Sequence, residues 1–126
     1  MLIATNTPDA PAAIGPYSQA IRCGDLLFTS GQIPLDAKTG EIVGNSISTQ
    51  AEQVMKNIDA LLKANGIGFG SVIKTTCFLT DMADFAAFNE VYSKYFDSDP
   101  KPARSTVAVR GLPKGVLCEV ETVAKA

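Results

Sequence analysis

The strand-like segments of this chain carry apolar residues on both faces, and this feature constrains the fold more than any other. In 72–79 and 116–124, apolar side chains occupy odd and even positions alike, so both faces of each strand need to be covered. Only two other segments show helical periodicity, and two helices can cover only one face of a sheet. We therefore expect another subunit to bury the second face, with a smaller loop of the same chain as the alternative.

Periodicity predicts the first helix over 49–65. Its apolar residues recur at steps of three and four, namely Ala51, Val54, Met55, Ile58, Leu61 and Leu62. Thr49 and Glu52 have the spacing of a capping box, which makes Thr49 the expected N-cap. Gly66 follows the last apolar turn and is the expected stop signal.

A second helix is predicted to begin near Asp81 and to end before Pro100. It places Phe85, Phe88 and Tyr92 on one stripe, which must pack against a sheet. Strands are expected at 18–23, 26–32, 72–79, 103–109 and 116–124. The order is then β-β-α-β-α-β-β, which indicates an α+β fold with two helices on one face of one sheet. We expect a single domain spanning 1–126.

The composition excludes several classes of protein. The chain has 126 residues, 46 % of them apolar and 19 % charged, a balance typical of a folded domain. It has no histidine, which removes Ser-His-Asp triads, imidazole metal sites and histidine bases, and its net charge of −2 disfavours nucleic acid as a partner. The three cysteines lie far apart and lack metal-ligand spacing, and their odd number argues against a closed disulfide framework. We therefore expect no metal, and without a membrane span or signal peptide we expect a cytoplasmic location.

One cation stands in an otherwise small and apolar strand. It is Arg104, and a guanidinium in such a place needs an anionic partner. If this strand pairs with the last one in an antiparallel register of odd residue sum, Arg104 shares a face with Glu119 and Glu121. The pattern alone favours a structural ion pair, on the sheet or at a subunit contact, over a functional patch.

Several motifs are spaced along nearly the whole chain in a fixed order. They are Ala13-Ile14-Gly15-Pro16-Tyr17-Ser18-Gln19, Thr29-Ser30-Gly31-Gln32-Ile33-Pro34, Val72-Ile73-Lys74-Thr75-Thr76, Pro102-Ala103-Arg104-Ser105 and Leu112-Pro113-Lys114 with Glu119-Val120-Glu121. Through these motifs the chain resembles the reactive-intermediate deaminase family, also called RidA/YjgF.

The resemblance implies a chorismate-mutase-like α+β fold that assembles as a homotrimer. The sheets of such a trimer pack around a central barrel and leave a cleft at each contact between subunits. The resemblance also implies hydrolysis of 2-imino acids, formed from 2-enamino acids such as 2-aminoacrylate, to 2-oxo acids and ammonia. It implies no cofactor, and the expected partners are the small-molecule substrate and further copies of the chain.

By motif, the resemblance assigns Arg104 to hold the substrate carboxylate and Glu119 to activate the attacking water. A planar guanidinium can hold a carboxylate through two parallel hydrogen bonds, which an ammonium cannot. Gly31 and Thr106 would offer backbone polar groups to the substrate. Well-studied active relatives carry a cysteine where this chain has Thr106, so modification of a thiol is not expected there. The remaining cleft residues that the resemblance implies are Tyr17, Ser30 and Asn89.

Two other functions compete with imine hydrolysis. A non-catalytic sensor of 2-oxo acids or similar carboxylates would need Arg104 more than Glu119, and a measurement of turnover separates it from an enzyme. A ribonuclease or translation inhibitor, roles given to some relatives, would need an RNA-binding surface. The acidic balance and the absence of tryptophan and of Lys/Arg clusters disfavour this third function.

Overall fold

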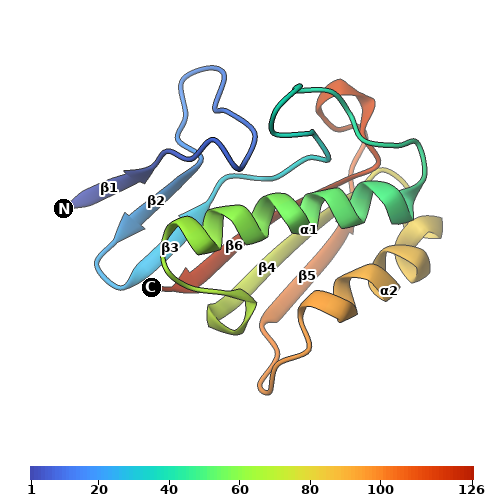
Figure 1. Ribbon diagram of the computed structural model, residues 1–126. Helices are drawn as coiled ribbons and strands as arrows, with labels where there is room; N and C mark the ends of the chain where they lie inside the picture. Colours follow the sequence, from blue (N-terminus) through green and yellow to red (C-terminus); the bar gives the residue numbers. More distant parts are fainter.

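The computed structural model describes residues 1–126 and contains a six-stranded sheet with two helices on one face (Figure 1). The strands are β1 (Leu2–Thr5), β2 (Ala20–Cys23), β3 (Leu26–Thr29), β4 (Val72–Leu79), β5 (Ala103–Ala108) and β6 (Cys118–Lys125), and the helices are α1 (Ile47–Ala64) and α2 (Phe85–Tyr95). Their order across the sheet is β1-β2-β3-β6-β4-β5. The α+β fold and the predicted element order are confirmed, and β1 is an additional strand.

Strand β5 lies at the edge of the sheet and pairs only with β4, in parallel. The predicted antiparallel pairing of β5 with β6 is therefore wrong. The physical reason is the connection: α2 takes the chain back along the sheet between β4 and β5, so both strands run in the same direction. The segment 109–117 then carries the chain from β5 past β4 to β6 and does not form a hairpin (Figure 1).

Side-chain caps set where the helices begin. Ser46 is the N-cap of α1, and its hydroxyl oxygen accepts a hydrogen bond from the backbone N–H of Thr49 at 3.2 Å. The predicted Thr49 cap is wrong, because that residue already lies inside α1. Gly66 has a φ of +74° just past the helix, which confirms it as the stop. Asp81 caps the short 3-10 turn before α2, where its carboxylate accepts from the N–H of Ala83 at 2.9 Å.

The core fills the space between the helices and the sheet. Burial raises the pKa of the Cys77 thiol to about 11 and that of Cys118 to about 12, so both stay neutral near pH 7. The largest fully buried apolar side chains between the helices and the sheet are Leu27, Val54, Met55, Ile58, Leu62, Leu79, Phe88, Phe96 and Val120.

Neither helix is both long and apolar enough to cross a membrane.

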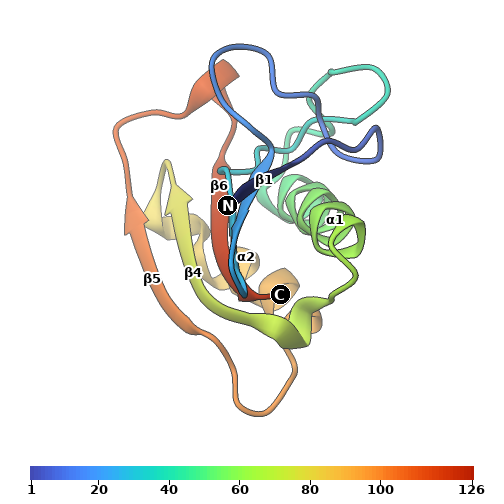
Figure 2. The same cartoon turned by 90° about the vertical axis from the view of Figure 1, so that its left-hand side faces the viewer.

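The opposite face of the sheet carries no helix, as Figure 2 shows. Phe28 lies opposite Val123 in the pairing register and Val107 lies opposite Phe78, so these side chains project from that face. Phe28 is 45 % exposed and Val107 is 44 % exposed. The prediction that the helices cover only one face is confirmed, and the loops leave apolar surface open on the other face.

Candidate functional site

Arg104 and Glu119 lie on opposite faces of the sheet. Arg104 pairs in register with Thr75, which is buried under the helices, whereas Glu119 pairs with Phe78 on the open face. The predicted shared face is therefore wrong, because β4 lies between the two strands that were expected to pair. We call Arg104, Asn89 and Thr106 the Arg104 cluster, and Glu119, Gly31, Ser30 and Tyr17 the Glu119 cluster.

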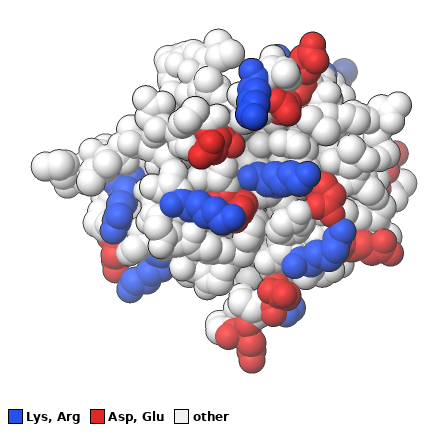
Figure 3. All heavy atoms as spheres, viewed as in Figure 1, with Lys and Arg blue, Asp and Glu red and all other residues white.

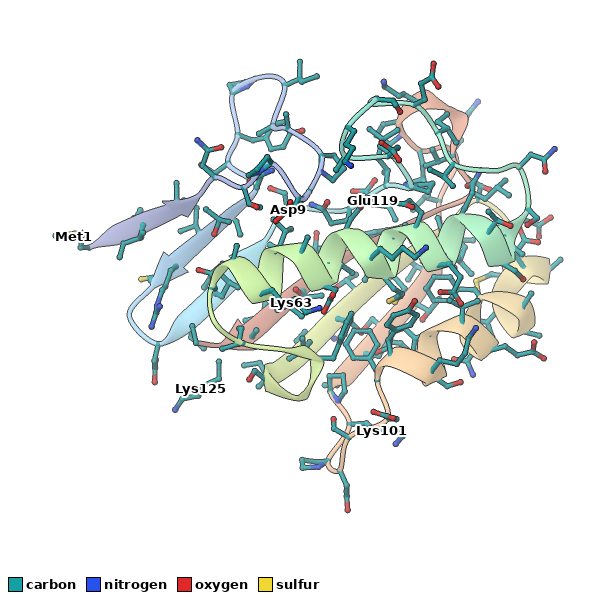
Figure 4. All side chains as sticks on the ribbon, viewed as in Figure 1. Met1, Asp9, Lys63, Lys101, Glu119 and Lys125 are labelled. Carbon is teal, nitrogen blue, oxygen red and sulfur yellow. The ribbon has the colours of Figure 1, made fainter.

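Arg104 and Glu119 are also offset along the sheet, because they pair with Thr75 and Phe78, which are three residues apart on β4. In Figure 4, Glu119 lies among the loops at the upper end of the sheet, and Lys101 lies at the lower end. Lys101 borders a cavity of about 410 Å³ beside Arg104, which Asn89 and Tyr92 also line. The structure thus divides the predicted site residues into two groups that one chain does not bring together.

Residues of helix α2 hold the Arg104 side chain at the β5 edge of the sheet. The guanidinium donates a hydrogen bond from Nη1 to Oδ1 of Asn89 at 2.6 Å. Its Cζ atom lies 4.5 Å from the ring centroid of Tyr92 and 5.4 Å from that of Phe85. The Arg104 side chain is half-buried: the rings of Tyr92 and Phe85 and the amide of Asn89 contact one part of it, and the rest faces the cavity.

Arg104 has no carboxylate partner within the chain. A half-buried guanidinium with one donor engaged keeps the other N–H groups of its planar fork free for an anion. The structural ion pair that the pattern favoured is thus absent from the chain. The ion pairs that do form join Lys63 to Asp59, Lys94 to Glu52 and Lys125 to Asp25.

The free edge of β5 adds backbone groups to the Arg104 cluster. In a parallel ladder, alternate residues of a strand bond to the neighbour, and those between them direct N–H and C=O away from it. The N–H of Val109 donates to the carbonyl oxygen of Leu79 at 2.7 Å, so the odd-numbered residues of this strand bond to β4. Arg104 and Thr106 therefore present their backbone groups outward. The Thr106 hydroxyl is buried and has no hydrogen-bond partner.

The Glu119 carboxylate lies directly over Gly31. Gln32 and Val120 exchange backbone hydrogen bonds of 2.8 and 3.1 Å, which draw the segment after β3 against β6. Burial of the carboxylate and, second, the charge of Glu121 raise the pKa of Glu119 above its ordinary value of 4.5. A carboxyl group with a raised pKa and no cationic partner is suited to exchange protons with a ligand or water.

Ser30 precedes Gly31 in the chain and is hydrogen-bonded to the loop before β2, which also carries Tyr17. The Ser30 hydroxyl donates to the carbonyl oxygen of Ser18 at 2.6 Å, and its backbone N–H donates to the carbonyl oxygen of Gln19 at 3.0 Å. These bonds fasten the segment after β3 to that loop. Tyr17 precedes Ser18 in this loop. Its side chain is 54 % exposed, so its ring is available to a partner or ligand.

Two residues of the Arg104 site were absent from the predicted set. Phe85 and Tyr92 were assigned to the apolar stripe of the second helix, and Tyr92 is indeed buried. Their contact with Arg104 depends on how α2 lies across β5, which residue spacing does not reveal. The only sequence signal was the coincidence of an aromatic stripe with a cationic strand directly after it.

Comparison with known proteins covers nearly the whole chain. The family model described as Endoribonuclease L-PSP matches residues 7–126. A Lactococcus lactis protein that carries the name of a regulator, AldR, is 60 % identical over 119 residues, 94 % of each chain. The Arabidopsis thaliana protein named Reactive Intermediate Deaminase A, chloroplastic, is 50 % identical over 119 residues, which are 94 % of this chain and 63 % of that one. The crystal structure of E. coli TdcF with bound serine has a TM-score of 0.92 at 44 % identity and covers 98 % of each chain.

Proposed function

The chain belongs to the RidA/YjgF family, and on this premise we propose that it hydrolyses reactive 2-imino acids to 2-oxo acids and ammonia. The family predicted from the sequence motifs is confirmed, whereas the reaction is our proposal. The substrates would be 2-iminopropanoate and 2-iminobutanoate, which arise from enamines such as 2-aminoacrylate. Water is the only co-reactant and no cofactor is needed. A cytoplasmic location stays a prediction, supported by the three free thiols of the chain.

The unpaired guanidinium of Arg104 is the observation that carries this proposal. A 2-imino acid offers a carboxylate beside the reacting carbon, and the open part of the Arg104 fork matches a carboxylate in charge and geometry. The outward backbone groups of β5 can then bind the polar atoms next to it. E. coli TdcF, whose structure matches 98 % of this chain, was crystallised with serine, an amino acid that also carries a carboxylate.

Two subunits would form each active site. Because Arg104 and Glu119 project from opposite faces, one chain cannot direct both at the same small molecule. We therefore assign the Arg104 cluster of one subunit and the Glu119 cluster of its neighbour to each cleft. The same contact would bury the open apolar face around Phe28 and Val107. The homotrimer implied by the family resemblance supplies such a contact three times by symmetry.

In the proposed reaction, Glu119 moves protons while Arg104 holds the substrate carboxylate. The Glu119 carboxylate takes a proton from water while the water oxygen bonds to C2, and this proton passes to the imine nitrogen. The resulting carbinolamine gives its hydroxyl proton to Glu119, which returns it to nitrogen as the C–N bond breaks. Ammonia leaves, and C2 becomes the carbonyl carbon of the 2-oxo acid.

A direct assay of hydrolysis tests the proposed function. An amino-acid oxidase generates the imine in the cuvette, and the release of ammonia and 2-oxo acid is followed with and without the protein. We expect the protein to accelerate the release in proportion to its concentration. A rate equal to that of spontaneous hydrolysis at every protein concentration would refute the deaminase.

A carboxylate sensor is the second candidate, because the Lactococcus lactis relative carries the name of a regulator. It would use the same Arg104 cluster and bind 2-oxo acids without turning over imines. The raised pKa of Glu119 favours the enzyme, because a group poised to exchange protons is not required for binding alone. The hydrolysis assay and a binding measurement on the same sample distinguish the two.

RNA cleavage, which the family description Endoribonuclease suggests, is the least supported function. On the face shown in Figure 3, Lys and Arg side chains alternate with Asp and Glu and form no continuous basic groove. The net charge of −2 and the absence of histidine also remove the usual means of binding and cleaving a phosphate backbone. We therefore place this function behind the other two.

We expect light scattering at micromolar concentration to report three times the 13.3 kDa mass of the chain. The physical reasons are the open apolar face and a site divided between two faces of the sheet. A stable monomer that hydrolyses imines at this concentration would contradict the shared site. The same protein sample serves for the hydrolysis assay, so assembly and activity are compared directly.

Gly31→Ala should lower imine turnover by about tenfold or more while the melting temperature changes by only a few degrees. A Cβ atom at Gly31 would lie 2.8 Å from Cδ of Glu119 and would overlap its carboxylate. Because the carboxylate ends a flexible side chain, it would swing away from its position and the fold would persist. Gly68→Ala is the control, since a Cβ there meets no atom within 4 Å and should alter neither quantity.

A further inference from the structure

The ring of Tyr92 is the nearest aromatic support of the Arg104 guanidinium, with Cζ 4.5 Å from its centroid. Tyr92 is only 7 % exposed, so most of its surface is covered and only a small part of it borders the cavity. A cation over the face of an aromatic ring is attracted to it, and more strongly where water is excluded. The ring therefore stabilises one orientation of a side chain that otherwise has many rotamers.

Tyr92 is itself held in place on two sides. Its hydroxyl and the hydroxyl of Thr75 share a hydrogen bond of 2.8 Å, and Thr75 is fully buried on β4. Its ring stacks on Phe96 with centroids 4.4 Å apart. Thr75 is also the residue that pairs in register with Arg104, so the strand that fixes the Arg104 backbone also fixes the ring under its guanidinium.

We propose that Tyr92, anchored by Thr75, is a positioning residue that orients the Arg104 guanidinium for the substrate carboxylate. This inference rests on the proposed function, in which Arg104 binds that carboxylate. With Asn89 holding one N–H group and Tyr92 holding the plane of the fork, the free donors face the cavity before a ligand arrives. Such preorganisation reduces the entropy lost on binding, so it strengthens binding without touching the ligand.

The test compares two substitutions of buried residues on α2. Tyr92→Leu removes the ring under Arg104. Val91→Ala is the control, because Val91 is buried on the same helix but borders Ser48 and Thr49 of α1 and not the cavity beside Arg104. We expect Tyr92→Leu to weaken the binding of 2-oxobutanoate roughly threefold to thirtyfold, to raise KM by a similar factor and to leave kcat nearly unchanged. Val91→Ala should lower the melting temperature and leave the dissociation constant unchanged.

Conservative variants separate the ring from its anchor. Tyr92→Phe keeps the ring and should restore most of the affinity that Tyr92→Leu loses. Thr75→Val removes the same hydrogen bond from the other side, so each of these changes should weaken binding roughly twofold to threefold. Combining them should weaken binding no further than one alone, because both delete one interaction. If the leucine variant does not fold, these two variants carry the test, and wild-type affinity in both would overturn the proposal.

A spectroscopic measurement checks the geometry without any ligand. The chain has three arginines, Arg22, Arg104 and Arg110, so ¹⁵N-labelled protein gives few Nε–Hε signals, and Arg104→Lys identifies the one from Arg104. Ring current should shift this signal upfield in the wild type and in Tyr92→Phe, and the shift should disappear in Tyr92→Leu. An Arg104 signal that does not move in Tyr92→Leu would overturn the contact itself.

The failures of the two proposals are distinguishable. If folded Tyr92→Leu binds 2-oxobutanoate as the wild type does, or if Val91→Ala weakens binding equally, the positioning role is wrong and the proposed function is untouched. If the wild type neither binds a 2-oxo acid nor accelerates imine hydrolysis, the proposed function is wrong and the positioning role falls with it.

Discussion

Glu119→Gln should lower imine turnover roughly 10²–10⁴-fold while the binding of 2-oxo acids persists. The amide keeps the size and polarity of the side chain but cannot take a proton from water. Turnover is measured with the oxidase-generated imine, and binding by calorimetry on the same folded sample. Turnover equal to that of the wild type would remove Glu119 from the mechanism.

The stability of the same variant provides an independent check. Burial and the charge of Glu121 raise the pKa of Glu119 in the folded state, so wild-type stability falls as pH rises from the unfolded pKa through the folded one. Glu119→Gln should therefore melt at the wild-type temperature in acid and at a higher temperature near pH 8. A structural ion pair with a cation predicts the reverse, a lower melting temperature near pH 8.

The second large effect is expected for Arg104→Lys, which should lower kcat/KM for imines by about tenfold or more. Lysine keeps the charge but replaces a rigid fork with a point charge, and a lost charge-assisted hydrogen bond weakens binding by about 1.5–3 kcal/mol. The bond to Asn89 and the ring contact with Tyr92 would also be altered.

Arg110→Lys is the control for this substitution, because Arg110 is exposed on the connection after β5. It should leave kcat/KM and the affinity for 2-oxo acids unchanged. If Arg104→Lys is folded and hydrolyses imines at the wild-type rate, Arg104 is not the carboxylate anchor.

The local order of the fold could be predicted from the sequence. The stripe from Ala51 to Leu62 marks α1, because apolar residues three and four apart must share one face. The presence of only two helical segments also predicts correctly that the helices leave one face of the sheet open. These features depend on near neighbours in the chain, and spacing records them directly.

The pairing of distant strands could not be predicted. The segment between β5 and β6 contains glycine and proline and resembles a hairpin, but α2 places β5 in parallel beside β4. The N-cap shows the same limit at a smaller scale: Thr49 and Glu52 fit a capping box, yet Ser46 begins α1 three residues earlier. Several local signals competed at each place, and tertiary packing selected one.

The site was predictable in its residue types but not in its geometry. Arg104 was recognisable as a cation that needs an anion, but the structural ion pair that the pattern favoured does not form within the chain. Its expected proximity to Glu119 in one chain was wrong, because the expectation depended on a strand pairing that does not form. The support from Tyr92 was invisible in the sequence, since an aromatic residue on a helix stripe is most often core.

Mixing two impaired variants tests the shared site most directly. Arg104→Lys and Glu119→Gln subunits are combined in equal amounts, unfolded and refolded together, and imine hydrolysis is compared with that of each variant refolded alone. If each cleft takes Arg104 from one subunit and Glu119 from its neighbour, about a quarter of the clefts regain both residues, and about a quarter of wild-type activity returns. Activity that stays at the level of the separate variants in demonstrably mixed trimers would show that no cleft is shared in this way.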